Sequence, residues 1–204
     1  KNAWVVVSEI AKRDGKSSVK SVVTSLAGKS VAAVMVAMVM CGGVASADTQ
    51  YGNGAVALST GPELATAIGD DAQAKNFGTV AVGHRSRANS RESVAVGYNA
   101  QTGGDRAIAI GFLANASTSD GTAIGGNSIA GQQAIALGQQ ATASTYATAV
   151  GAYSKASDIN ATAVGNSAQA KEDYTTAIGS GAVADRDYAT VIGAGNRSEA
   201  ARSV

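Results

Sequence analysis

Few residues of this 204-residue chain could perform chemistry, and their spacing does not assemble a catalytic or metal site. His84 is the single histidine and Cys41 the single cysteine. A metal cluster or a catalytic triad cannot be built without a second imidazole or another available thiol. His84 directly follows a recurrent glycine, which favours an exposed turn position. We therefore expect no enzyme, no cofactor and no metal site.

The acidic and glycine-rich segments do not change this expectation. Asp70-Asp71 and Glu172-Asp173 fall in expected turns or loops, where solvation explains them. The segment 103–105, Gly-Gly-Asp, is too short for a calcium-binding nonapeptide array, because that motif would itself have to repeat. The recurrent glycines are not followed by the lysine of a phosphate-binding P-loop.

Composition indicates a repetitive protein with small side chains. The chain has 25 glycines, one proline and 4% aromatic residues, although 45% of its residues are hydrophobic. Residues 1–47 carry six lysines and arginines against two acidic residues, whereas residues 48–204 carry ten against thirteen. The later part therefore has no basic footprint for nucleic acid, and repetition must replace bulky core residues.

Residues 1–47 have the features of an export signal. Lys20 and Lys29 precede an apolar run over residues 31–40, and the small triplet 45–47 follows it. This order predicts a signal peptide that is cleaved between Ala47 and Asp48. The run is shorter than the ~20 residues of a membrane span, which disfavours a transmembrane anchor or a buried helix. Met40 before Cys41 disfavours a lipoprotein.

A four-residue unit that ends in glycine recurs along the rest of the chain, for example Val80-Ala-Val-Gly83 and Thr148-Ala-Val-Gly151. Such a period indicates a solenoid. The glycines lie 13 or 14 residues apart, and we expect them at turns that need positive φ or a close backbone approach. They are Gly69, Gly83, Gly97, Gly111, Gly125, Gly138, Gly151, Gly165, Gly179 and Gly193.

Small residues recur three and five positions after nine of the ten glycines, with mostly polar residues between them, and the last coil departs from the pattern with Asn196 and Ser198. This alternation predicts a second strand with one buried face. Fourteen residues allow two short strands but no crossover helix, so about ten coils must stack directly, ~4.8 Å apart. Residues 48–65 are interpreted as a cap and an incomplete coil, in which residues 55–58 imitate the glycine unit and Pro62 makes a capping turn.

The first strand of each coil is apolar on both faces, which is typical of a strand buried on both sides. One face can pack inside the coil, but the other would form a long exposed stripe that monomers rarely tolerate. We therefore expect a homo-oligomer, and the pattern does not settle which face makes the subunit contact. The expected core or subunit ladder is Ile68, Val82, Val96, Ile110, Ile124, Leu137, Val150, Val164, Ile178 and Ile192.

Two segments resemble a known family. Residues 2–18, with Ala3-Trp-Val-Val-Val-Ser-Glu9, resemble the extended signal-peptide region of type V secreted proteins, and residues 51–198 resemble YadA-like head repeats of trimeric autotransporter adhesins. The resemblance implies a left-handed parallel β-roll over 66–198, a homotrimer, and display on the bacterial outer membrane. It also implies binding to a host matrix protein or cell-surface receptor, with autoaggregation possible. Residues 199–204 would begin a downstream region, because we see no stalk or membrane anchor in this sequence.

Adhesion through a multivalent rod is the favoured function. The expected ligand surface lies on loops and on the polar strand face, where Tyr and Arg are favoured contact residues. Its candidates are Arg87, Arg91, Tyr98, Arg106, Tyr146, Tyr153, Tyr174 and Tyr188. One alternative is an ice-binding or purely structural solenoid, although valine and isoleucine interrupt the column of threonines that an ice-binding face would need. The other is a β-helix acyltransferase, which would need a hexapeptide period and a catalytic histidine.

Overall fold

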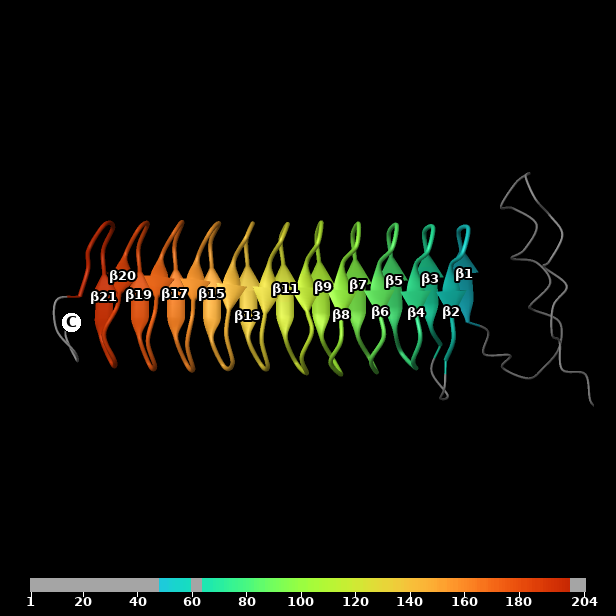
Figure 1. Ribbon diagram of the computed structural model, residues 1–204, viewed down its shortest axis with the longest axis horizontal. Coiled ribbons are helices and arrows are strands. Elements are labelled where there is room, and N and C mark those ends of the chain that lie inside the picture. Colours follow the sequence, from blue (N-terminus) through green and yellow to red (C-terminus); the bar gives the residue numbers. More distant parts are fainter. Residues whose placement is uncertain (1–47, 60–63, 199–204) are drawn as a thin grey trace, which may run out of the picture. The chain divides into compact units, whose positions relative to one another are not determined.

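The computed structural model describes residues 48–59 and 64–198, which form a rod of stacked coils built only from β-strands (Figure 1). The export signal predicted over residues 1–47 and the capping turn at Pro62 lie outside the described residues. Each coil contributes one strand to each of two parallel sheets, and every strand pairs with its own copy in the next coil. The expected all-β parallel solenoid with a period of about 14 residues is therefore confirmed.

The first sheet, called sheet A, has eleven strands in sequence order. These strands are β1 (Thr49–Tyr51), β3 (Thr66–Ile68), β5 (Val80–Val82), β7 (Val94–Val96), β9 (Ile108–Ile110), β11 (Thr122–Ile124), β13 (Ile135–Leu137), β15 (Thr148–Val150), β17 (Thr162–Val164), β19 (Thr176–Ile178) and β21 (Thr190–Ile192).

The second sheet, called sheet B, has ten strands of two residues each. These strands are β2 (Val56–Ala57), β4 (Gln73–Ala74), β6 (Arg87–Ala88), β8 (Gln101–Thr102), β10 (Asn115–Ala116), β12 (Ile129–Ala130), β14 (Thr142–Ala143), β16 (Lys155–Ala156), β18 (Gln169–Ala170) and β20 (Val183–Ala184).

The core between the sheets consists almost entirely of alanine. The middle residue of each sheet A strand, such as Ala95 or Ala109, is fully buried, as are the alanines that end most sheet B strands. Within residues 48–59 and 64–198, Val191 is the single apolar core residue larger than alanine. The short alanine side chain fills the thin space between the sheets at close packing, which explains why this fold needs few aromatic residues.

Buried hydroxyl groups in the core form hydrogen bonds with nearby backbone or hydroxyl oxygens. Ser86 Oγ donates to the carbonyl oxygen of Gly83 at 2.9 Å, and Thr175 Oγ1 donates to that of Glu172 at 2.6 Å. Thr102 Oγ1 donates to Ser93 Oγ at 3.0 Å. These bonds avoid the cost of burying an unpaired polar group.

The first coil differs from its prediction. Residues 55–58 do not imitate the glycine unit, because Val56 and Ala57 pair with Gln73 and Ala74 in sheet B. The true first copy is β1, whose three residues pair with Thr66, Ala67 and Ile68. Gly52 follows this strand with a φ of 130°, like the later recurrent glycines. The interpretation was wrong because the spacing from Gly52 to Gly69 is longer than one period, and Gln50 replaces the usual alanine.

Both ends of the described rod carry residues that depart from the repeat. At the first coil Gln50 occupies the inward position, and its Oε1 accepts a hydrogen bond from the amide of Ala57 at 3.4 Å. At the last coil Val191 fills the equivalent position, and Asn196 Nδ2 donates to the carbonyl oxygen of Ile192 at 2.9 Å. In the preceding coils, the carbonyl oxygen at this position accepts a hydrogen bond from the amide of the recurrent glycine in the next coil. The amide of Gly193, for example, donates to the carbonyl oxygen of Ile178. Asn196 therefore supplies the missing donor, which is how terminal repeats close a solenoid.

Candidate functional site

The recurrent glycines form a tight backbone ladder at one edge of the rod. Gly97 and Gly111 have φ values of 132° and 134°, which is accessible chiefly to glycine. A Cβ on Gly97 would lie 2.4 Å from the carbonyl oxygen of Gly111. Both reasons expected from the sequence, positive φ and close backbone approach, therefore apply at the same residues.

The turns also hold non-glycine residues in the left-handed backbone region. Two positions after the recurrent glycines stand Arg85, Leu113 and Tyr153, with φ values from 57° to 61°. Their amides point along the rod, since the amide of Arg85 donates to the carbonyl oxygen of Asp70 in the preceding coil at 2.9 Å. The stacking of coils therefore imposes positive φ on residues that rarely adopt it, a demand that the sequence pattern did not reveal.

Four outward surfaces remain for contacts. They are the faces of sheets A and B and two edges. We call the edge formed by the two residues after each recurrent glycine the glycine edge. The edge formed by the residues between each sheet B strand and the next sheet A strand is called the loop edge.

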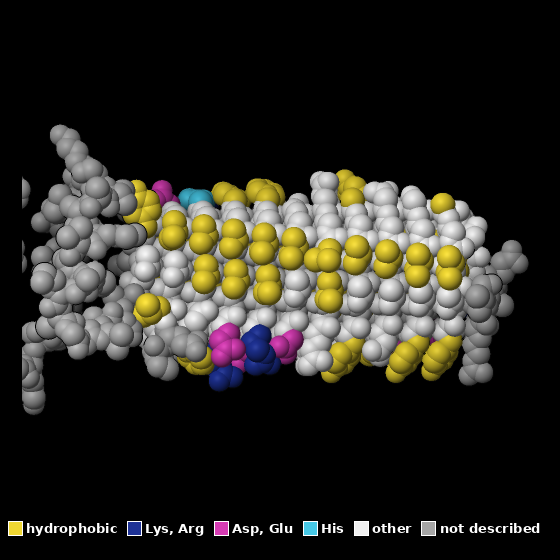
Figure 2. Space-filling view, turned by 180° about the vertical axis from the view of Figure 1, so that it is seen from behind, with side chains coloured by type: hydrophobic (Ala, Val, Ile, Leu, Met, Phe, Trp, Pro, Cys, Tyr) yellow, Lys and Arg dark blue, Asp and Glu magenta, His cyan; other side chains and the backbone are white. Residues whose placement is uncertain are grey.

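The outward face of sheet A carries one apolar row along the whole rod, beside a first strand position that is mostly threonine. The third residues of successive sheet A strands form a continuous row that includes Ile68, Ile110 and Ile178, each 37–39% exposed. Figure 2 shows this row as an unbroken line. The ladder expected from the sequence therefore lies outside, and the alanine column lies inside. The alanine face therefore lines the coil, and the face that carries this row is the one left for contacts with another molecule.

The outward face of sheet B is mainly polar. Gln73, Arg87, Gln101 and Gln169 stand in its outward column, interrupted by apolar residues such as Ile129. The two sheets therefore present faces of opposite character, although they enclose the same alanine core.

The glycine edge carries a stack of rings. His84, Tyr98 and Phe112 occupy the same position of three successive coils, and their ring centroids are 5.4 Å apart in both steps. Tyr98 is 46% and Phe112 52% exposed. Tyr153 lies on the same edge, further along the rod.

The loop edge carries two ion pairs between successive coils. Arg91 Nε donates to Asp105 Oδ2 at 2.9 Å, and Arg106 binds both carboxylate oxygens of Asp120 at 2.7 and 3.0 Å. The hydrogen bond from Arg91 lowers the pKa of Asp105, and that from Arg106 lowers the pKa of Asp120. The guanidinium of Arg91 also lies 5.8 Å from the ring centroid of Phe77.

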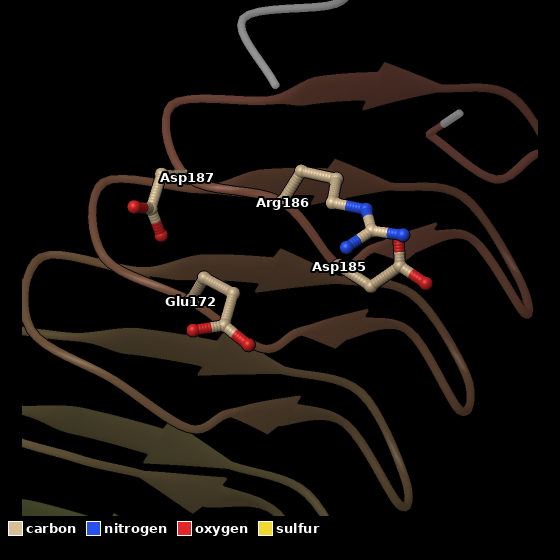
Figure 3. A pocket seen from close by; sticks show the side chains of 4 residues that line it. All are labelled: Glu172, Asp185, Arg186 and Asp187. Atoms are coloured by element: carbon tan, nitrogen blue, oxygen red, sulfur yellow. The ribbon is translucent and has the colours of Figure 1, made fainter. Parts of the chain in front are cut away.

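Towards the C-terminal end the loop edge becomes aromatic and acidic. Tyr174 and Tyr188 stack with their centroids 5.3 Å apart and their planes 3° from parallel. Beside them Glu172, Asp185, Arg186 and Asp187 line an open hollow of ≈ 220 Å³ (Figure 3). The hydrogen bond from Ser198, helped by Arg197, lowers the pKa of Asp185.

Within the described residues, no group of three or more His, Cys, Asp or Glu side chains could hold a metal ion. No helix in that part of the chain is long and apolar enough to cross a membrane.

The structure distributes the eight candidate ligand residues over three surfaces. Arg87 lies on the face of sheet B, and Tyr98 and Tyr153 lie on the glycine edge. The remaining five lie on the loop edge: Arg91, Arg106, Tyr146, Tyr174 and Tyr188. Sequence reasoning missed Asp105 and Asp120 as partners of the arginines. The fixed period could have found both, because each aspartate stands 14 residues after its arginine.

The fold and its surfaces define a repeat-built head with extended faces, a class that is not typical of enzymes. The family described as extended signal peptide of the type V secretion system matches residues 1–38. The family described as YadA head domain repeat matches residues 74–100, 103–128, 130–146, 145–168 and 170–196.

The chain belongs to the trimeric autotransporter adhesins with YadA-like head repeats. Its extended signal peptide directs export by type V secretion, and the protein is displayed at the outer membrane and cell surface. No curated protein gives a significant match to the chain.

Proposed function

We propose that three copies of this chain associate through the outward faces of sheet A, and that the trimer attaches the bacterium to a host matrix protein or cell-surface receptor. The observation that carries the proposal is the contrast between the two outward faces. The third position of sheet A is apolar in all eleven strands, whereas sheet B is mainly polar.

An exposed apolar stripe of this length is best explained by a partner that covers it. A second and third copy suit the stripe, because each copy offers the same row with the same spacing. Cyclic symmetry brings three such rows to one axis and leaves the face of sheet B in water.

The ligand contacts are proposed on the loop edge and on the face of sheet B. The loop edge offers Tyr146, Tyr174 and Tyr188, and the sheet face offers Arg87. Three copies on one rod raise the effective concentration of each later contact, so weak individual sites suffice. The same gain in effective concentration applies if the partner is a head on another bacterial cell, and such contacts would produce autoaggregation.

The first experiment measures the solution mass of the full chain, exported with its own signal, by light scattering. Three chain masses are expected. The substitution Ile110→Lys would place a charge within the apolar row and should reduce the mass to one chain, whereas the matched substitution Gln101→Lys on sheet B should leave it unchanged. A monomeric wild-type protein would contradict the proposed assembly.

Attachment is then measured with immobilised matrix proteins and with cultured cells. Binding by the trimer that is lost in the Ile110→Lys monomer supports multivalent adhesion. If the wild-type protein is a trimer but binds no matrix protein, cell or second bacterial population, the adhesive role is contradicted while the proposed assembly stands.

A further inference from the structure

The three stacked rings of the glycine edge form an exposed surface outside the apolar row of sheet A. His84, Tyr98 and Phe112, here called the ring ridge, each stand one residue after a recurrent glycine and thus beside the apolar third position of sheet A. Figure 2 shows the histidine and neighbouring apolar side chains along the rim, above that row. The ridge therefore extends the apolar face around the edge over three successive coils.

The same three coils are unusual at a second position. The first residue of their sheet A strands is Val80, Val94 or Ile108. Seven of the other eight sheet A strands begin with threonine, and the exception begins with Ile135. Figure 2 shows this difference as a short second apolar row below the continuous one. Large apolar residues at the first strand position thus coincide with rings at the glycine edge.

Contact within one chain does not account for this coincidence. In the central coil Val94 and Tyr98 are four residues apart and are separated by the third-position row at Val96. Four residues of extended chain span a distance on the order of 10 Å. The two features lie on opposite margins of sheet A, so a valine at one margin does not support a ring at the other.

Contact between copies does account for it. In a cyclic assembly around an axis parallel to the rod, the two margins of sheet A are different, and each margin meets the opposite margin of the next copy. Equivalent coils lie at the same height. The glycine edge of coils 83, 97 and 111 would therefore face the first strand positions of the same coils in the neighbour.

We propose that the ring ridge packs against Val80, Val94 and Ile108 of a neighbouring copy of this chain. This inference rests on the proposed trimer, and it adds which edge is buried and which side chains meet there. Burial of aromatic rings against branched apolar residues stabilises such contacts. The stacked pair Tyr174 and Tyr188 lies on the loop edge, next to strands that begin with threonine. The outward face of sheet B, which carries Gln101, points away from this contact.

Photo-cross-linking tests the proposed contact directly. The full chain, exported with its own signal, would carry Tyr98→p-benzoylphenylalanine, and the matched control would carry the same photo-reactive residue in place of Gln101, on the outward face of sheet B in the same coil. Illumination of the position-98 protein should produce covalent oligomers, with the cross-link mapped by mass spectrometry to the segment 94–108 of another chain. Position 101 should give no covalent oligomer.

The proposal is overturned if a trimer forms but position 98 gives no inter-chain product, or if its product maps outside sheet A. A monomer by light scattering would overturn both this inference and the proposed trimer. The two failures are therefore distinguishable by the mass measurement.

A double-mutant cycle provides the second test without a bulky probe. The substitutions Val94→Thr and Tyr98→Ser introduce the residues that stand at the same two positions of another coil, Thr176 and Ser180, so the fold of the chain should tolerate them. Each substitution should lower the temperature at which half of the trimer has dissociated. The two effects should be non-additive because the two side chains touch between chains. Strict additivity would contradict the contact.

Discussion

Gly97 and Gly111 follow the same strand position of successive coils, and a Cβ on Gly97 would lie 2.4 Å from the carbonyl oxygen of Gly111. A real Cβ cannot occupy that space without moving the backbone. We therefore expect Gly97→Ala to destabilise the head by about 1–3 kcal/mol, through backbone strain at positive φ as well as the clash. Thermal unfolding monitored by circular dichroism would measure the change.

Gly126 provides the matched control for that substitution. A Cβ there would have the carbonyl oxygen of Phe112 as its nearest neighbour, at 3.9 Å, which is ordinary contact. Gly126→Ala should leave the unfolding midpoint nearly unchanged. Equal effects at the two glycines would show that the spacing between coils does not set the need for glycine.

Tyr153 occupies a turn position with a φ of 61°, a conformation in which asparagine is less strained than tyrosine. Tyr153→Asn should therefore raise the free energy of unfolding by up to about 1 kcal/mol. The reciprocal substitution Asn127→Tyr, at the equivalent turn position, should lower it. A loss of stability in both variants would mean that the ring of Tyr153 makes contacts that outweigh its backbone strain.

The ion pairs of the loop edge predict a response to acid. Because Arg91 and Arg106 lower the pKa of Asp105 and Asp120 below the ordinary 3.8, the unfolded chain binds protons more readily than the folded one. The pairs stabilise the head above about pH 4, and this contribution is lost as the pH falls through the lowered pKa values.

The double substitution Asp105→Asn and Asp120→Asn should accordingly lower the unfolding midpoint slightly at pH 7, and this difference should shrink as the pH falls through the lowered pKa values. The contribution should also weaken with added salt, because both pairs are at the surface. Glu92→Gln serves as a control for lost charge on the same edge. An identical difference between variant and wild type at pH 7 and pH 2 would contradict the role of ionised carboxylates.

Asn196 donates to the carbonyl oxygen of Ile192 in place of the amide of a further coil. Asn196→Ala should cost about 0.5–1.5 kcal/mol and should act locally. Amide hydrogen exchange should increase in β19 and β21, while the central strands β9 and β11 stay protected. Faster exchange spread evenly along the rod would argue against a capping role.

Asp48 is the proposed first residue after signal cleavage, and its carboxylate accepts hydrogen bonds from the amides of Ser59 at 2.8 Å and Ala65 at 2.9 Å. The amino-terminal sequence of the exported protein should begin with Asp48. Asp48→Ala should lower the stability of the first coil by about 0.5–1.5 kcal/mol per lost bond. A mature terminus downstream of Asp48 would remove this contribution and refute the proposed cleavage site.

The sequence by itself determined the period, the two strands of each coil and the glycine turns. These features repeat locally, and each recurrence at 13 or 14 residues reinforces the same interpretation. It also determined that the strands of sheet A alternate a middle alanine with outer positions that are apolar residues or threonine, as the unit around Ala95 illustrates. The first coil was misread because Gln50 and a longer spacing to Gly69 break the pattern on which that reasoning depends.

Tertiary structure alone decided which side chains meet. Alanine faces inward because two sheets this close leave room for no larger row, so Ile110 and its equivalents face outward. The rings of Tyr98 and Phe112, and the charges of Arg91 and Asp105, meet because stacking places residues 14 apart one above the other. Positive φ at Arg85 or Tyr153 follows from the direction in which each turn amide must point, a constraint imposed by the neighbouring coil and not by the residue itself.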